Sequence, residues 1–237
     1  MTKLDNAIIM AAGLGTRMRP LTNETPKPLV KVNGTRMIES IIQALHRENI
    51  NDITIVTGYL ADKFDFLPQK YAGVKLINNP YFNKYNNISS LYVARKELKN
   101  TIILDGDQLI YNPEILSADF EKSGYAGSLI NEWSDEWIMH TDNEGRVISC
   151  DRDGGDQGWR LYSVSKWNAN DSAMLGELVE KEFENKNYDI YWDDVPMFIY
   201  ADKFNLSVHK INKEDIVEID SIEELADIDS SYKKYVK

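Results

Sequence analysis

The stretch Asn6-Ala-Ile-Ile-Met-Ala-Ala-Gly-Leu-Gly-Thr-Arg-Met-Arg-Pro20 decides the fold. Its first six residues form a short apolar run, which predicts a buried β-strand. Gly13 and Gly15 then allow a tight turn and let backbone N–H groups approach a phosphate closely. Thr16 offers a hydroxyl donor, and Arg17 offers a rigid fork of N–H donors that matches phosphate oxygens. Because ligands of parallel sheets bind at the carboxyl ends of strands, this stretch predicts a phosphate site there.

The loop differs from two widespread phosphate-binding motifs. No Gly-Lys-Ser/Thr follows, so it is not a P-loop, and Met18 stands where the dinucleotide-binding fingerprint has its third glycine. A Gly-x-Gly pair alone is equally compatible with an ordinary strand-to-helix turn. The motif Thr25-Pro-Lys-Pro-Leu29 favours phosphate binding, because prolines on both sides stiffen the backbone around Lys27 and fix its direction. The alternative for Lys27 is an ordinary surface lysine.

Strands and helices alternate through the first half of the chain and become less regular in the second. The predicted strands are 6–11, 52–57, 74–78, 101–105, 125–131, 137–140, 147–151, 159–164, 208–211 and 217–219. The predicted helices are 36–48, 60–71, 89–98, 168–183 and an amphipathic helix that begins after a capping serine, Ser221. Strands alternating with helices of this length indicate βαβ units. We therefore expect an α/β fold with a central, mostly parallel mixed sheet flanked by helices, in a single domain 1–237.

Composition narrows the class of protein. The 237 residues carry a formal net charge of -11, which argues against a nucleic-acid partner because binding to a phosphate backbone depends on Lys and Arg. No apolar run approaches the ~20 residues needed to span a bilayer, so no membrane insertion is expected. The single cysteine, Cys150, cannot form an internal disulfide, and the N-terminus resembles no signal peptide. These features favour a cytoplasmic protein.

Two acidic segments are candidates for a metal site. Asp105-Gly-Asp107 follows a predicted strand, where a carboxylate can reach a Mg²⁺ ion that bridges nucleotide phosphates. If the strand continues, the two aspartates point to opposite faces, and only one binds metal directly. Val217-Glu-Ile-Asp-Ser221 alternates apolar and acidic residues, which places Glu218 on the same face as Asp220. The alternative for Asp220 is an acid that precedes a helix.

Taken together, the glycine loop and the Pro-Lys-Pro motif resemble the nucleotidyltransferase family that activates sugar 1-phosphates and phosphocholine. The resemblance covers nearly the whole chain and implies a Rossmann-like nucleotidyltransferase fold, with a nucleotide-binding half at about 1–115 and an acceptor-binding half at about 116–237 that includes the C-terminal helix. It implies catalytic roles for Lys27, between the α-phosphate and the acceptor phosphate, and for Arg17, on the outer phosphates. It implies a Mg²⁺ site at Asp107 and Asp220. The nucleotide-binding candidates are Ala11, Ala12, Gly13, Leu14, Gly15, Thr16, Arg17, Asn87, Ser90 and Asp105.

The second half adds aromatic residues beside acids. Asp135-Glu-Trp137 and Tyr191-Trp-Asp-Asp194 suit a quaternary ammonium, since cation–π contacts are worth roughly 0.5–2 kcal/mol each. An ordinary core position is the alternative for each aromatic residue. These segments resemble the bacterial choline-phosphate cytidylyltransferase branch of the family, which implies acceptor contacts from Trp137, Tyr191 and Asp193, with Trp192 as a further candidate. That branch also shares the segment around Asn87 and Ser90, for which an N-terminal helix cap is the alternative to a place near the pyrimidine.

The expected function is therefore a cytidylyltransferase that transfers CMP from CTP to phosphocholine, giving CDP-choline and pyrophosphate by Mg²⁺-assisted in-line displacement. The expected partners are CTP and a small phosphorylated or phosphonate amine. A related branch acts on 2-aminoethylphosphonate, whose primary ammonium prefers carboxylates, and Asp193 with Asp194 would serve it. Two more functions fit these motifs: a sugar-1-phosphate nucleotidyltransferase and a non-catalytic nucleotide-binding regulatory domain.

Overall fold

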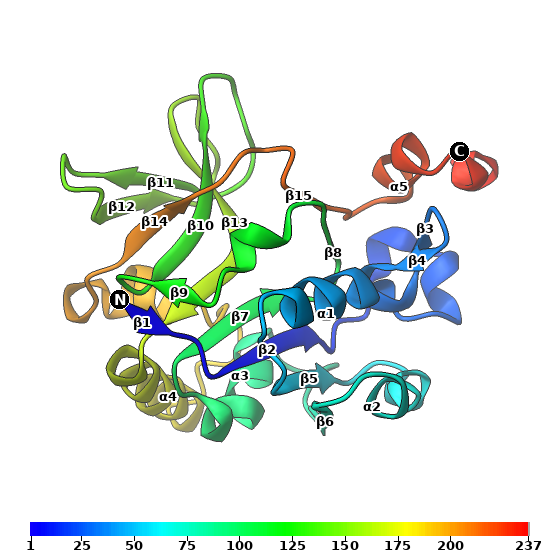
Figure 1. The fold of residues 1–237 in the computed structure, drawn as a ribbon, viewed down its shortest axis with the longest axis horizontal. Coiled ribbons are helices and arrows are strands. Elements are labelled where there is room, and N and C mark those ends of the chain that lie inside the picture. The colour runs from blue at the N-terminus through cyan, green and yellow to red at the C-terminus, as the bar shows by residue number, and fades with distance from the viewer. Residues whose placement is uncertain (237) are drawn as a thin grey trace.

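A nine-stranded mixed sheet forms the centre of the protein, for which a computed structural model describes residues 1–236 (Figure 1). Seven strands follow the order β12-β11-β13-β7-β2-β5-β6, and β10 pairs with both β13 and β14. The strands are β2 (Asn6–Ala11), β5 (Ile53–Thr57), β6 (Val74–Asn78), β7 (Thr101–Asp105), β10 (Gly124–Ile130), β11 (Ile138–Thr141), β12 (Val147–Asp151), β13 (Gly158–Trp167) and β14 (Ser207–Lys210).

The first half of the chain supplies four neighbouring parallel strands of this sheet, β7, β2, β5 and β6. β2 lies between β5 and β7, with Ile9 opposite Ile55 on one side and Leu104 on the other. Side chains of β2 alternate between two apolar cores: Ile9 faces α1 (Met37–Arg47), and Ile8 faces α3 (Ile88–Ala94) and α4 (Ala169–Glu184). Helices therefore cover both faces, as the βαβ pattern predicts, and this arrangement confirms the expected α/β fold.

β13 connects the parallel part to the rest of the sheet. Its C-terminal half pairs antiparallel with β7, where Val164 lies opposite Leu104, and its N-terminal half pairs with β11, where Arg160 lies opposite Ile138. β10 runs along its other edge. A single long strand thus carries residues of the second half to the carboxyl ends of the parallel strands.

Shorter elements complete the fold and bring the C-terminal segment to the glycine loop. β15 (Ile216–Glu218) pairs with β8 (Gln108–Ile110), directly after the Asp105–Asp107 turn. A third apolar core packs Ile219 and Leu225 of this segment against Met18. The remaining elements are β1 (Thr2–Lys3) paired with β9 (Asp119–Phe120), β3 (Lys31–Val32) paired with β4 (Thr35–Arg36), α2 (Leu67–Lys70), α5 (Ile222–Ile228), a π-helix at Val195–Ile199 and several 3₁₀ turns.

Two predicted helices are shorter than expected. The 60–71 segment follows a left-handed Leu60, with φ of 49°, and breaks into a 3₁₀ turn at Ala61–Phe64 and the four-residue α2. Pro68 has no backbone N–H to donate to the Phe64 carbonyl, so a continuous helix cannot form, and the proline lies in the first turn of α2. The 89–98 helix is regular only over α3 and ends in a 3₁₀ turn at Arg95–Glu97. Among residues 1–236, no helix is long and apolar enough to cross a membrane.

Candidate active site

The glycine loop forms one wall of a cavity of about 280 Å³ at the carboxyl end of β2. Gly15 has φ of 61°, and a Cβ there would come within 3.0 Å of Lys27 Cβ and 3.1 Å of Thr22 Cγ2, so glycine is needed for both conformation and space. Gly13 has open space around it. The cavity is lined by Met10, Ala11, Ala12, Gly13, Gly15, Thr16, Arg17, Lys27, Pro28, Asn87, Ser90, Asp105, Asp107 and Asp220. Of the predicted nucleotide-binding residues, Leu14 alone is not part of this lining.

Lys27 is the centre of a charged cluster at the base of this cavity. Its Nζ lies 2.6 Å from Asp107 Oδ2 and 2.5 Å from Asp220 Oδ1, and Arg17 Nη2 lies 2.9 Å from the same Asp220 oxygen. Burial opposes the charge on Lys27, but the two carboxylates prevail and raise the pKa of its ammonium above the ordinary value. The structure therefore brings four predicted site residues together from segments as distant in the sequence as those of Arg17 and Asp220.

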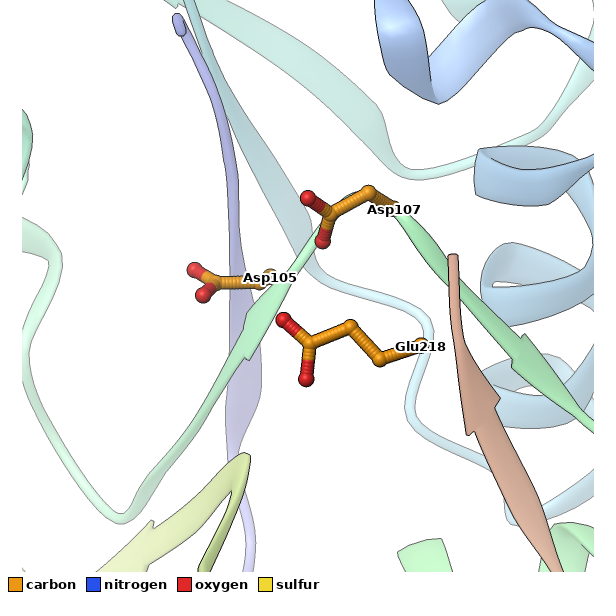
Figure 2. A group of neighbouring side chains, drawn as sticks. All are labelled: Asp105, Asp107 and Glu218. Atoms are coloured by element: carbon orange, nitrogen blue, oxygen red, sulfur yellow. The ribbon is translucent and has the colours of Figure 1, made fainter. Parts of the chain in front are cut away.

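Figure 2 shows the side chains of Asp105, Asp107 and Glu218 as neighbours, and an oxygen from each lies within 4.8 Å of the other two. The strand does not continue through these two aspartates, because β7 ends at Asp105 and the chain turns at Gly106, so the condition that would put them on opposite faces is not met. The Gly106 N–H donates to the Met10 carbonyl at 2.8 Å, and a Cβ at position 106 would lie 3.0 Å from that oxygen. The tight turn at glycine thus lets both carboxylates face the cleft.

This carboxylate group suits a divalent cation. Burial raises the pKa of Asp105 and of Glu218 well above ordinary carboxyl values, and neighbouring carboxylates add to the increase. Asp107 Oδ1 is buried and has no hydrogen-bond partner among the described residues. Hard cations such as Mg²⁺ prefer carboxylate oxygens, and a bound cation would satisfy this oxygen and neutralise the cluster. Glu218 therefore joins the predicted ligands as a candidate.

A second cavity of about 380 Å³ opens beside the first. Trp137 and Tyr191 stand edge to face in its wall, with ring centroids 6.0 Å apart. Burial raises the pKa of Asp193 in the same wall to about 7, although the nearby Tyr125 hydroxyl opposes the increase. The full lining is Arg17, Asn87, Asp105, Asp107, Asp135, Glu136, Trp137, Leu161, Ser163, Tyr191, Asp193, Glu218 and Asp220.

Trp192 does not lie in this wall, which corrects its place among the acceptor candidates. Its side chain is buried in the core, with its ring centroid 6.2 Å from that of Tyr125 and 6.1 Å from that of Trp167. The Trp192 backbone N–H donates to Asn87 Oδ1 at 2.8 Å, and the Asn87 side chain forms no capping hydrogen bond with α3. Asn87 lines both cavities. Ser90 Oγ accepts from the Asn79 amide at 3.1 Å.

Arg152 is a residue of this region that the sequence did not indicate. Its guanidinium carbon lies 4.1 Å from the ring centroid of Phe198 and 5.3 Å from that of Trp137, and it forms an ion pair with Asp194. Asp194 is buried and also accepts the Tyr191 N–H at 2.9 Å, so it does not line the cavity. Arg152 comes from the end of β12, 42 positions away, and no local motif marks such a contact.

Comparisons with known proteins agree with this geometry. A sequence profile described as "Nucleotidyl transferase" matches residues 6–131. A 2-aminoethylphosphonate cytidylyltransferase from Lancefieldella rimae is 36% identical over 230 residues, covering 96% of this chain and 93% of that protein. A choline-phosphate cytidylyltransferase from Streptococcus pneumoniae is 34% identical over 228 residues, covering 96% of this chain and 98% of that protein.

Solved structures give the same picture of the fold. A CTP:phosphocholine cytidylyltransferase from Streptococcus pneumoniae superposes with a TM-score of 0.89 at 34% identity, covering 96% of this chain and 99% of that chain. A putative glucose-1-phosphate thymidylyltransferase from Bacillus anthracis superposes with a TM-score of 0.78 over 96% of this chain and 95% of that one. Its 15% identity shows a shared fold alone.

Proposed function

This chain belongs to the nucleotidyl transferase family of enzymes, and from that premise we propose that it is a cytidylyltransferase that transfers CMP from CTP to a small amine bearing a phosphate or phosphonate. One observation carries the proposal: the two cavities share Arg17, Asn87, Asp105, Asp107 and Asp220, so they form one continuous cleft. The glycine loop at one end suits a triphosphate, and the carboxylates and aromatic rings at the other end suit a cation. Residues 1–237 act as a single nucleotidyltransferase domain in this proposal.

In the reaction, an acceptor phosphate or phosphonate oxygen attacks the α-phosphorus of CTP in line, and pyrophosphate leaves. The attacking oxygen is already anionic at neutral pH, so no general base is required. Lys27 has three N–H donors, and the two directed at Asp107 and Asp220 leave the third for the α-phosphate. Arg17 and the loop amides bind the leaving pyrophosphate. Catalysis then comes from positioning and charge neutralisation.

We assign the divalent cation to Asp107 and Asp220, which line the same cavity, and we take it to be Mg²⁺. Asp105 and Glu218, whose carboxylates lie close to that of Asp107, are further candidate ligands. When bound, the cation neutralises phosphate charge. Asp107 and Asp220 then hold both the cation and the Lys27 ammonium beside the same phosphates. This double use explains why a buried lysine is placed between two carboxylates.

The lining of the second cavity suits two kinds of amine acceptor. Phosphocholine is favoured by the Trp137–Tyr191 pair, since a trimethylammonium binds aromatic faces and donates no hydrogen bond. The place of Trp192 in the core removes the third aromatic wall, while Asp135, Glu136 and Asp193 line the same cavity. A primary ammonium can donate hydrogen bonds to these carboxylates, which outnumber the aromatic rings. The second candidate acceptor is therefore 2-aminoethylphosphonate.

The proposal is tested by pyrophosphate release from CTP and Mg²⁺ with phosphocholine, 2-aminoethylphosphonate, phosphoethanolamine and glucose 1-phosphate. We expect release with at least one amine acceptor and little with the sugar phosphate. Release with glucose 1-phosphate alone would defeat the acceptor assignment, and no release with any acceptor would favour a nucleotide-binding module. Trp137→Leu separates the two amine classes, because loss of a cation–π contact should reduce kcat/KM by about 2–30-fold for phosphocholine and less for a primary amine.

A further inference from the structure

A third cavity, of about 440 Å³, lies on another side of the segment that carries Lys27. None of its lining residues belongs to the two cavities of the active-site cleft. Thr25 and Pro26, which directly precede Lys27, form part of its wall. Its volume is within the range of about 300–1,000 Å³ that small-molecule sites usually have. The cavity is therefore separate from the cleft but shares a wall with it.

Positive charge gathers at this cavity on a chain whose net charge is -11. Lys31, Arg36 and Lys63 line it, against a single acid, Glu24. Lys31 and Lys63 are exposed and take part in none of the ion pairs formed within residues 1–236, whereas Arg36 pairs with Glu39 at 3.2 Å. Two lysines that form no ion pair within the described part of the chain therefore create a local attraction for anions at this cavity, which the overall charge would not give.

The same cavity offers flat apolar surface. The Arg36 guanidinium carbon lies 4.8 Å from the ring centroid of Phe66, and this cation–π contact holds both side chains in the wall. Tyr232 donates its hydroxyl hydrogen to the Lys31 carbonyl at 2.8 Å, which fixes a second ring at the cavity. Ligand sites typically combine an apolar lining with a few placed polar groups, and this cavity has both.

We propose that this cavity is a second ligand site, which binds a small phosphorylated molecule with an aromatic or heterocyclic ring, such as a nucleoside monophosphate. Lys31 and Lys63 bind the phosphate, and Phe66 and Tyr232 contact the ring. A ligand in this site touches Pro26 and therefore the backbone next to Lys27, so the site has a direct physical route to the active-site cleft.

The test is a titration of the isotope-labelled full chain with AMP, CMP and inorganic phosphate, followed by the NMR shifts of backbone amides. Amides of Thr25, Lys31 and Lys63 report the proposed site, and those of Gly13 and Gly15 report the cleft, so the location of binding does not depend on enzyme activity. The diagnostic variant is Lys31→Glu/Lys63→Glu. Lys3→Glu/Lys122→Glu is the matched control, because these lysines are also exposed and the charge change is the same.

We expect AMP and CMP to shift the amides of the proposed site, with a dissociation constant raised about tenfold or more by the diagnostic variant, since it replaces two phosphate-binding cations by anions. The control should keep the wild-type value. Shifts confined to the cleft, or equal weakening in both variants, would overturn the site. Equal affinity for inorganic phosphate and AMP would overturn the assignment to a ring-bearing ligand.

Discussion

At the scale of single residues, Lys27 has the clearest expected effect. Its ammonium is buried at the base of the cleft and is paired with both Asp107 and Asp220. Lys27→Ala should reduce kcat for pyrophosphate release by about 10²–10³-fold, the usual effect of removing one group that stabilises transition-state charge. The measurement is steady-state kinetics with CTP and the best amine acceptor. Lys122→Ala, an exposed lysine far along the chain, is the control and should keep wild-type turnover.

Removal of Lys27 also leaves two carboxylates without their shared cation, so a fold check must accompany the kinetics. Circular dichroism should show native secondary structure in Lys27→Ala with a lower melting temperature. A variant that is folded and nearly as active as the wild type would contradict the assigned role.

The pH dependence of acceptor binding should follow Asp193. Burial raises the pKa of this carboxyl to about 7, from an ordinary value of 3.8. A cationic amine binds the ionised form, whose fraction rises from about 10% at pH 6 to about 90% at pH 8, so KM for the acceptor should fall roughly tenfold over that interval. Asp193→Asn should raise KM and remove this dependence. The comparison is necessary because the acceptor phosphate titrates in the same range, and an unchanged pH profile in Asp193→Asn would exclude Asp193 as the cause.

The same group gives a stability change of defined sign. Asp193 binds its proton more tightly in the folded chain than in the unfolded chain, so the folded state holds more protons between pH 4 and pH 7. The free energy of unfolding should therefore decrease as pH rises through this window. Asp193→Asn should flatten that part of the curve, as followed by urea unfolding at a series of pH values.

Local motifs placed most of the cleft residues but could not place all of them. Arg17 and Lys27 stand in short motifs whose residue types fit phosphate, and the sequence predicted a shared location that the ion pairs now show. Trp192 lies next to Tyr191 in the sequence, yet its ring packs in the core. The sequence could not decide this, because the direction of a side chain in an irregular segment depends on tertiary packing.

At the scale of elements, one ion pair joins the wall of the proposed acceptor cavity to the end of β12. The irregular segment from Tyr191 through the π-helix Val195–Ile199 is held to the end of β12 by Arg152, which pairs with buried Asp194 and stacks on Phe198. Arg152→Met should lower the free energy of unfolding by about 1–3 kcal/mol, because Asp194 loses its cation in a partly exposed pair. KM for the acceptor should rise, while KM for CTP stays near the wild-type value.

The control for this prediction is Arg152→Met/Asp194→Asn. An Asn at position 194 can still accept the Tyr191 N–H without leaving an unpaired charge, so the double variant should recover part of the lost stability and acceptor affinity. Equal increases in KM for CTP and for the acceptor would show a general loss of structure rather than a role in the acceptor wall.

Periodicity predicted the strands of this protein better than its shorter helices. Apolar runs such as Asn6–Ala11 and Thr101–Asp105 are buried on both faces, as central parallel strands usually are. The 60–71 segment has helical spacing but begins at a left-handed residue, Leu60, and forms only a single α-helical turn, Leu67–Lys70. Pro68, which removes a helical hydrogen bond, marks this break in the sequence, whereas the left-handed conformation of Leu60 is set by its surroundings.

At the scale of the whole molecule, packing between distant segments brings the residues of the active-site cleft together. Ile219 and Leu225 pack on Met18, and this apolar contact places Asp220 beside Arg17 and Lys27. The alternation of residues 217–221 predicted a short strand with Glu218 on the same face as Asp220, but it could not show that Glu218 lies beside Asp105 and Asp107. A pairing of β15 with β8 brings them together, and such a long-range register cannot be read from local pattern.

Because the cleft joins both ends of the chain, ligands should stabilise the entire fold. A ligand at a concentration 100 times its dissociation constant adds about 2.7 kcal/mol to the free energy of unfolding, or about 5–11 °C in melting temperature for a domain of this size. We expect CTP with Mg²⁺ to give a shift of this order and CTP with EDTA to give less, as measured by differential scanning calorimetry. Asp107→Asn should remove the difference between Mg²⁺ and EDTA, whereas Asp227→Asn, an exposed acid on α5, should keep it. Equal shifts with and without Mg²⁺ in the wild type would mean that the carboxylates serve Lys27 and Arg17 alone.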